Sequence, residues 1–148
     1  DQEGPSSCPE YFCWIHEDLR PWKDTGISKE MLKRAQMAGT FKLVIAGGKG
    51  YVEEYPKGFQ SRVDFTLWGI LQLLRRYPGK VPDVELVIHS GDLPVVTSSH
   101  YPGPGGTSPP PMFGYCADDS TLDIVFPDFS FWGWREINIK PWGLLLKE

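Results

Sequence analysis

Apolar residues recur every three or four positions in three segments of the chain, residues 11–19, 31–35 and 65–77. This spacing places apolar side chains on one face of an α-helix. Ser28 and Asp64 stand just before the second and third segments, where a short polar side chain caps a helix N-terminus. We therefore expect three helices, of which the third is the strongest and largely buried.

Runs with high β-propensity occupy residues 41–46, 51–55, 84–88 and 122–126, and residues 137–142 are expected to be extended. The glycine-rich stretch between the first two runs favours a tight turn, so these two runs predict a hairpin. The third run follows the strongest helix after a short loop. Because this order is typical of α/β layers, we expect an α/β fold and parallel pairing of the third run.

Proline and glycine dominate residues 101–111, and this composition continues neither a helix nor a sheet ladder. A chain of 148 residues is long enough for one domain with a core and short for two. We therefore expect a single domain over residues 1–148 with a mobile loop at 101–111. Near its end, the apolar run Leu144–Leu146 is expected to be exposed.

The charge of the chain argues against a nucleic-acid partner. Its 15 basic and 19 acidic residues give a net charge of −4, whereas phosphate backbones attract dense Lys and Arg surfaces. The first residues, from Asp1, are polar and no long apolar run follows them, so we expect no signal peptide and no membrane span within these residues. Hydrophobic residues make up 41% of the chain and six are Trp, which predicts a packed domain with aromatic faces for packing or ligand stacking.

The three cysteines, Cys8, Cys13 and Cys116, permit at most one disulfide within the chain. Together with His16 they lack the paired spacing of a zinc site. The acidic residues between positions 118 and 128 match no calcium loop, so they predict a solvated acidic face. No metal site and no cofactor are expected.

Asp123 and two tryptophans are the candidate functional residues near the end of the chain. From the residues alone, Asp123 is a carboxylate that caps a loop or pairs with Arg135. Trp132 and Trp134 flank Gly133, which leaves two flat faces close together with little obstruction between them. Such faces either stack on a sugar ring or an acceptor peptide, or pack in a core or between domains.

Three segments in order, Cys8–Trp22, Phe65–Asp83 and Ser120–Trp142, resemble the plant members of glycosyltransferase family 90. The family includes the Rumi-type protein O-glucosyltransferases and the fungal capsular-associated protein. The match covers residues 8–142. It implies a GT-B architecture of two Rossmann-like α/β halves, in which this chain is the N-terminal, acceptor-side half and the donor-binding half is missing. It also implies residence in the lumen of the ER or Golgi, and it leaves open a membrane anchor outside this chain.

The resemblance further implies an inverting O-glycosyltransferase that moves glucose or xylose from a UDP-sugar to a hydroxyl of a glycan or protein. The UDP-sugar is a co-substrate, so no cofactor is implied. An inverting transfer needs a base for the acceptor hydroxyl. The resemblance carries this catalytic role to Asp123, while Trp132 and Trp134 are expected to contact substrate through their flat faces. Without a donor half, the fragment is expected to be inactive alone.

Residues 86–94 follow the family pattern only in part. Relatives carry a run resembling Asp-Cys-Asp-Asp-Arg-Pro, and here Asp92 and Pro94 match it while four other positions depart. Asp92 is therefore expected to contact substrate. The departing residue at Leu93 removes a cation, and Cys13 also stands where relatives usually have Arg. These departures favour two alternatives, a non-catalytic carbohydrate- or peptide-binding module and a truncated gene product.

Overall fold

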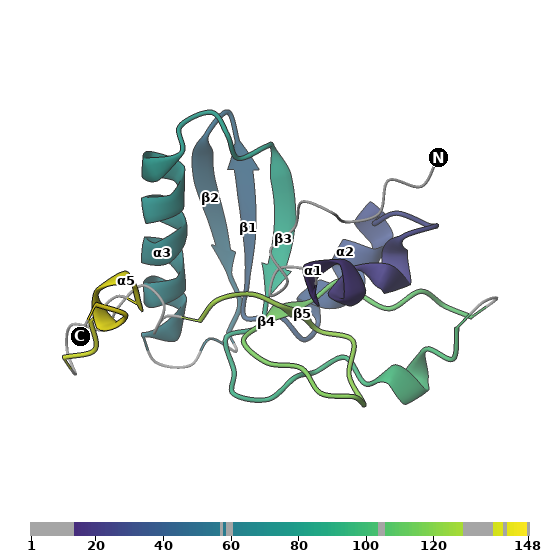
Figure 1. The fold of residues 1–148 in the computed structure, drawn as a ribbon. Coiled ribbons are helices and arrows are strands. Elements are labelled where there is room, and N and C mark those ends of the chain that lie inside the picture. Colours follow the sequence, from purple (N-terminus) through teal and green to yellow (C-terminus); the bar gives the residue numbers. More distant parts are fainter. Residues whose placement is uncertain are drawn as a thin grey trace, which may run out of the picture.

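The computed structural model describes residues 14–56, 58, 61–103, 106–128, 138–140 and 142–147, and its fold is a mixed α/β one (Figure 1). One five-stranded sheet has the order β2-β1-β3-β4-β5. Its strands are β1 (Phe41–Ala46), β2 (Lys49–Glu54), β3 (Val84–Ile88), β4 (Phe113–Gly114) and β5 (Ile124–Val125). The helices are α1 (Trp14–Asp18), η2 (Arg20–Trp22), α2 (Lys29–Gln36), α3 (Arg62–Arg76), η3 (Ser98–His100) and α5 (Trp142–Leu145). The expected α/β class is confirmed.

The predicted hairpin is confirmed as β1 and β2, which pair antiparallel from Phe41↔Glu54 to Ala46↔Lys49. Its turn needs two residues in the left-handed region, and Gly47 and Gly48 supply φ values of 56° and 74°. Only a residue without a Cβ adopts these angles at low cost. The Gly47 amide also donates to the Asp83 carboxylate at 2.8 Å, so the turn is tied to the start of β3.

The other half of the sheet is parallel. β3 pairs antiparallel with β1 and parallel with β4, and β4 pairs parallel with β5. The expected strand at 84–88 is confirmed, whereas the run 122–126 contributes only the two residues of β5. The sequence did not predict β4, because its two residues follow a proline-rich loop and carry no alternating pattern.

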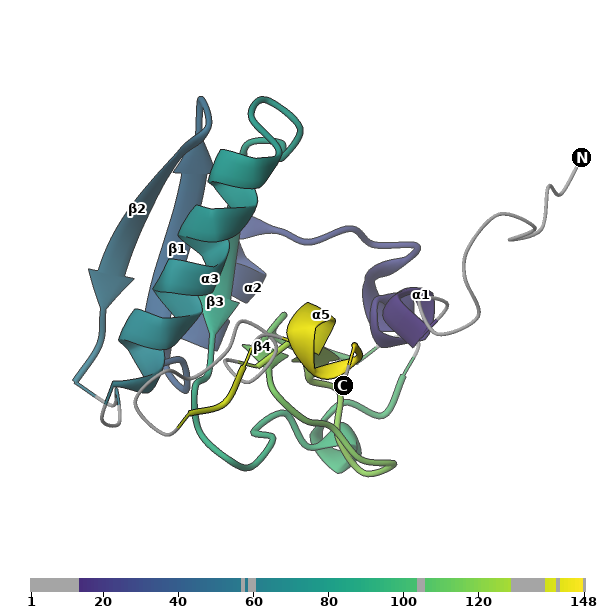
Figure 2. The same cartoon turned by 60° about the vertical axis from the view of Figure 1, so that its left-hand side comes forward.

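The longest helix, α3, packs along one face of the β2-β1-β3 strands (Figures 1 and 2). Its apolar side contributes Val63 to the main core, where Val63 packs with the inward residues of β1 and β3: Phe41, Leu43, Ile45 and Ile88. Two details of the prediction are wrong. The helix begins at Arg62, so Asp64 lies in its first turn and is not its cap. Trp68 and Leu71 are 52% and 46% exposed, so the helix is amphipathic and not largely buried.

A second core lies on the opposite face of the sheet, under α2. The predicted N-cap is confirmed, since the Ser28 hydroxyl accepts from the Met31 amide at 3.3 Å. Ala35 on the helix packs on Val87 of β3, with Val96 and Met112 completing a buried cluster. The two faces of β3 thus carry two cores, and this central strand is fixed from both sides.

The Pro/Gly-rich loop is packed at its far end. Pro109, Pro110 and Pro111 are buried, and the Trp22 indole donates to the Pro109 carbonyl at 2.9 Å. This described part of the loop is therefore held in place, in contrast to the expected mobility. Near the end of the chain, an extended segment through residue 142 was predicted, but Trp142 begins the helical turn α5, and Leu144–Leu146 are exposed as expected.

No helix in the described part of the chain has the length and apolar character needed to cross a membrane.

Candidate functional site

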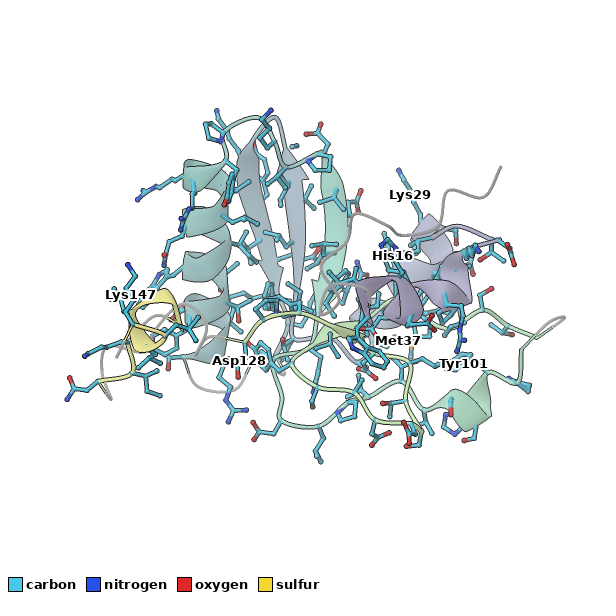
Figure 3. All side chains as sticks on the ribbon, viewed as in Figure 1. His16, Lys29, Met37, Tyr101, Asp128 and Lys147 are labelled. Carbon is cyan, nitrogen blue, oxygen red and sulfur yellow. The ribbon has the colours of Figure 1, made fainter. Side chains whose placement is uncertain are left out.

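The carboxyl ends of three parallel strands meet at one edge of the sheet. The His89 amide donates to the Phe113 carbonyl at 2.7 Å, and the Phe126 amide donates to the Gly114 carbonyl at 3.0 Å, so the segments that leave β3, β4 and β5 start side by side. Asp128, which follows β5, is labelled near the lower end of α3 in Figure 3. Ligand sites of open α/β sheets gather at such an edge, so this edge is the candidate functional site.

Asp92 is the exposed carboxylate of this edge. Its two oxygens face the Arg62 guanidinium, with Oδ1 at 2.7 Å from Nη1 and Oδ2 at 3.2 Å from Nη2. The Asp92 side chain is 78% exposed and the Arg62 side chain only 18%. A bidentate pair of this kind fixes the plane of a carboxylate, and the exposed side of the carboxylate remains open to a ligand.

A buried hydroxyl pair lies beneath the loop that carries Asp92. Thr40 and Ser90 are 2% and 0% exposed. The Thr40 hydroxyl donates to the Ile88 carbonyl at 3.0 Å and accepts from the Ser90 amide at 3.1 Å, and its oxygen lies 3.0 Å from the Ser90 hydroxyl. Ser90 is one of the positions that depart from the family run. Its hydroxyl is satisfied inside the fold, so this departure leaves no unpaired polar group at Ser90.

The loop after β4 supports the same edge. The Cys116 thiol donates to the Asp92 carbonyl at 3.1 Å and is not in a disulfide. Burial, together with the charges of Asp123, Asp92 and Asp118, raises the pKa of this thiol. A raised pKa keeps Cys116 protonated near neutral pH, so it acts as a hydrogen-bond donor and is a poor nucleophile.

Tyr115 joins the loop after β4 to α3. Its hydroxyl hydrogen-bonds with the Thr66 hydroxyl, which itself donates to the Arg62 carbonyl at 2.8 Å. Burial raises the pKa of Tyr115, and the charge of Asp128 adds to the rise. The Tyr115 ring lies 5.6 Å from the Phe126 ring, centroid to centroid, so an aromatic wall borders the edge.

Asp123, the residue expected to act as the base, is buried and hydrogen-bonded to the main chain. It is 2% exposed, and its carboxylate accepts from the Val95 amide at 3.0 and 3.1 Å and from the Val96 amide at 2.9 Å. It precedes β5, so it lies at the amino end of that strand and not at the carboxyl edge. The carboxylate is buried because two main-chain amides of the segment after Asp92 need an acceptor there. This geometry agrees with the loop-capping alternative, and Arg135, the other proposed partner, lies outside the described residues.

A cavity of about 600 Å³ opens between α1 and residues 117–125. Trp14, 71% exposed, stands on its wall with several carboxylates, and Asp123 borders it while exposing little surface. Three of these carboxylates have partners. Glu17 pairs with Arg20 at 3.3 Å, Asp18 accepts from the Val125 amide at 3.0 Å, and Asp118 accepts from the Ser120 amide and hydroxyl at 2.8 and 2.7 Å. The two hydrogen bonds from Ser120 lower the pKa of Asp118.

Of the residues expected to contact substrate, Asp92 lies at the carboxyl edge, and Trp132 and Trp134 lie outside the described residues. Arg62 was missed, because a single Arg at the start of a helix carries no signal in the sequence. No group of three metal-binding side chains close enough for a cation occurs among the described residues.

The class that the fold and this edge define is an α/β domain with an arginine-held carboxylate where parallel strands end. Comparison with known proteins identifies the family to which this domain belongs. The model of "Glycosyl transferase family 90" matches residues 3–148, and the chain belongs to this family. The expected family is thereby confirmed, whereas the plant type stays a prediction.

Relatives in this family carry informative names. The chain is 27% identical to O-glucosyltransferase rumi of Drosophila melanogaster over 140 residues, 94% of this chain and 32% of the relative. It is 31% identical to the O-glucosyltransferase rumi homolog of Anopheles gambiae over 95% of this chain and 34% of the relative. It is 30% identical to protein O-glucosyltransferase 1 of Bos taurus with the same coverage, 95% and 34%. The chain thus spans about a third of the length of the curated relatives it matches.

Proposed function

We propose that this chain forms the acceptor side of an O-glycosyltransferase that transfers glucose or xylose from a UDP-sugar to a hydroxyl of a protein or glycan. The names of the relatives support the transfer of glucose to oxygen. The observation that carries the proposal is the exposed Asp92 carboxylate held by Arg62 where parallel strands end. We further propose that the domain is one half of a GT-B enzyme and works in the lumen of the ER or Golgi.

In the proposed reaction, Asp92 is the base. As the acceptor oxygen forms its bond to the anomeric carbon, the bond from that carbon to the diphosphate oxygen breaks and UDP leaves. The proton of the acceptor hydroxyl passes to the Asp92 carboxylate, which is a general-base step. Asp92 suits this role because its side chain is 78% exposed, so a hydroxyl can reach an oxygen that is already oriented.

Asp123 is the competing assignment for the base, as expected from the family resemblance. Its burial and its bonds to the Val95 and Val96 amides favour a structural role instead. A base must lie within hydrogen-bond reach of the proton that it removes, and a carboxylate occupied by two amides offers less access than that of Asp92. Trp132 and Trp134 are proposed to stack on the acceptor, next to this site.

The test is transfer from UDP-glucose and UDP-xylose by the full-length protein and by its Asp92→Asn, Asp123→Asn and Asp119→Asn variants. Asp119 is an exposed carboxylate of the loop before β5 and serves as the matched control. We expect Asp92→Asn to lower kcat by about 10²- to 10⁴-fold, the usual contribution of a general base. Asp119→Asn should match the wild type. Transfer retained in Asp92→Asn but lost in a folded Asp123→Asn protein would move the base to Asp123.

We expect residues 1–148 expressed alone to show no transfer, because relatives named for the activity are about three times as long. Turnover by this segment would contradict the proposed division into acceptor and donor halves.

The second candidate is a non-catalytic carbohydrate- or peptide-binding module. The observation that favours it is Leu93, an apolar side chain that is 75% exposed at the position where the family resemblance implies a cation. However, the Arg62 guanidinium supplies a cation to the same edge. Calorimetric binding of an acceptor without turnover in the full-length protein would select the module.

A further inference from the structure

We infer that Arg62 is a positioning residue, which sets the orientation of the Asp92 carboxylate for the proposed reaction. This inference rests on the proposed function. Two parallel contacts, at 2.7 and 3.2 Å, join both oxygens to both terminal nitrogens of the guanidinium. A pairing of this form specifies the plane of the carboxylate as well as its position.

The two partners differ in their surroundings. The side chain of Arg62 is 18% exposed, whereas that of Asp92 is 78% exposed. A mostly exposed carboxylate on a loop samples several rotamers unless a partner restricts it. The buried partner is the arginine, so the arginine fixes the geometry and the carboxylate is presented to solvent.

Arg62 is itself held by the longest helix of the protein. It is the first residue of α3, and the next residue, Val63, is 6% exposed within the main core. The Arg62 carbonyl accepts from the Thr66 hydroxyl at 2.8 Å, and that hydroxyl also bonds to Tyr115 of the loop after β4. The guanidinium therefore extends from a main chain that both the core and a neighbouring loop restrain.

Arg62 also contacts the main chain of the loop that it orients. Its Nη1 lies 3.5 Å from the Ser90 carbonyl, while the Cys116 thiol donates to the Asp92 carbonyl. The roles are thus divided: the thiol restrains the main chain of Asp92, and Arg62 restrains its side chain. A lysine at position 62 would keep the charge but make only one point contact, so the plane of the carboxylate would be free to rotate.

The experiment compares Arg62→Lys and Arg62→Ala with the wild type in the full-length protein, with Arg76→Ala as the matched control. Arg76 lies at the other end of α3, where its guanidinium carbon stands 6.0 Å from the centre of the Tyr77 ring. We expect both Arg62 variants to lose about 10²-fold in kcat, the cost of misplacing a reacting group by about 1 Å. The KM for the acceptor should change less than about twofold, because Arg62 does not contribute to binding of the acceptor in the ground state. Arg76→Ala should behave as the wild type.

Added guanidinium chloride, at concentrations that leave the protein folded, should restore part of the kcat of Arg62→Ala and none to Arg62→Lys. A structural defect at the helix start would not be repaired in this way. If Arg62→Ala does not fold, Arg62→Lys decides alone, because it keeps the stem and the charge: a wild-type kcat in a folded Arg62→Lys protein overturns the inference. A rise in KM with unchanged kcat also overturns it, since Arg62 would then bind substrate directly.

The Asp92→Asn variant separates the two possible failures. If it abolishes transfer while Arg62→Lys and Arg62→Ala do not, only the role of Arg62 is wrong. If Asp92→Asn retains transfer, Asp92 is not the base, and the inference about Arg62 fails while the transferase function stands. If the wild type has no transfer, the proposed function itself is wrong and the inference fails with it.

Discussion

Replacing Asp123 by Asn should unfold this domain more readily, and the structure gives the size of the effect. The carboxylate receives the Val95 and Val96 amides, and Val96 is 3% exposed. Hydrogen bonds to a charged acceptor contribute about 1.5–3 kcal/mol each, and a buried donor left without an acceptor costs about 1–3 kcal/mol. Asn keeps one neutral acceptor and turns an NH₂ group toward the second amide. We therefore expect a loss of about 2–4 kcal/mol in the free energy of unfolding.

The assay is urea unfolding of residues 1–148 followed by tryptophan fluorescence. The control is Asp119→Asn, an exposed change that should stay within about 0.5 kcal/mol of the wild type. Hydrogen exchange adds a local measurement, because the amides of Val95 and Val96 should lose their protection in Asp123→Asn before those of β1 do. Both results would follow from the loss of one buried acceptor.

Wild-type stability in Asp123→Asn would refute this reasoning. It would show that the two amides have another acceptor within reach or that the segment after Asp92 tolerates their exposure. If the same variant then lost transfer in the full-length protein, the carboxylate would act on substrate and not on the fold.

Two further predictions follow from the pKa shifts. The hydrogen bond from Lys42, whose Nζ lies 2.8 Å from the Glu85 carboxylate, lowers the pKa of Glu85 from its ordinary value of 4.5. The ion pair therefore stabilises the folded protein above pH 4.5, and this stabilisation is lost as the pH falls through the pKa of Glu85 in the folded protein. Glu85→Gln should therefore cost about 0.2–1 kcal/mol at pH 7 and less at pH 3 in urea unfolding, whereas an equal cost at both would exclude the ion pair as its cause. Cys116 should react with iodoacetamide more slowly at pH 8 than a free cysteine, measured by mass spectrometry of its peptide, because its pKa is raised by burial and by carboxylates that include Asp92. Asp92→Asn should speed the reaction, and an unchanged rate would mean that the charge of Asp92 does not act on the thiol.

Local signals in the sequence were sufficient for the elements near its middle. The hairpin was predictable because two β-prone runs flank glycines that the turn requires, and α2 because Ser28 caps an apolar stripe. The start of α3 was not, because Ser61 and Asp64 are equally good caps by residue type, and burial of Val63 in the core extends the helix toward its N-terminus. Packing decided that boundary.

The site was less predictable than the fold, and the reason is the same for each residue. A partial motif pointed to Asp92 as a site residue, but its partner Arg62 is 30 positions away along the chain. The hydrogen bonds of Asp123 were unpredictable for the same reason, because the path of the loop alone brings the Val95 and Val96 amides to its carboxylate. Spacing along a sequence carries no information on such pairs until the strands are placed.

The two halves of the sheet are built by different means, and this affects how each tolerates change. The β2-β1-β3 half is a long backbone ladder, which many sequences with the right alternation would satisfy. β4 and β5 share only two residue pairs. Two carboxylates add hydrogen bonds around them: Asp18 accepts from the Val125 amide of β5, and Asp123 accepts from the Val96 amide. We expect the loops near the proposed acceptor site to tolerate changes in length and sequence as long as Asp18 and Asp123 remain. A library that varies the proposed acceptor choice would best keep both fixed and randomise the residues between them.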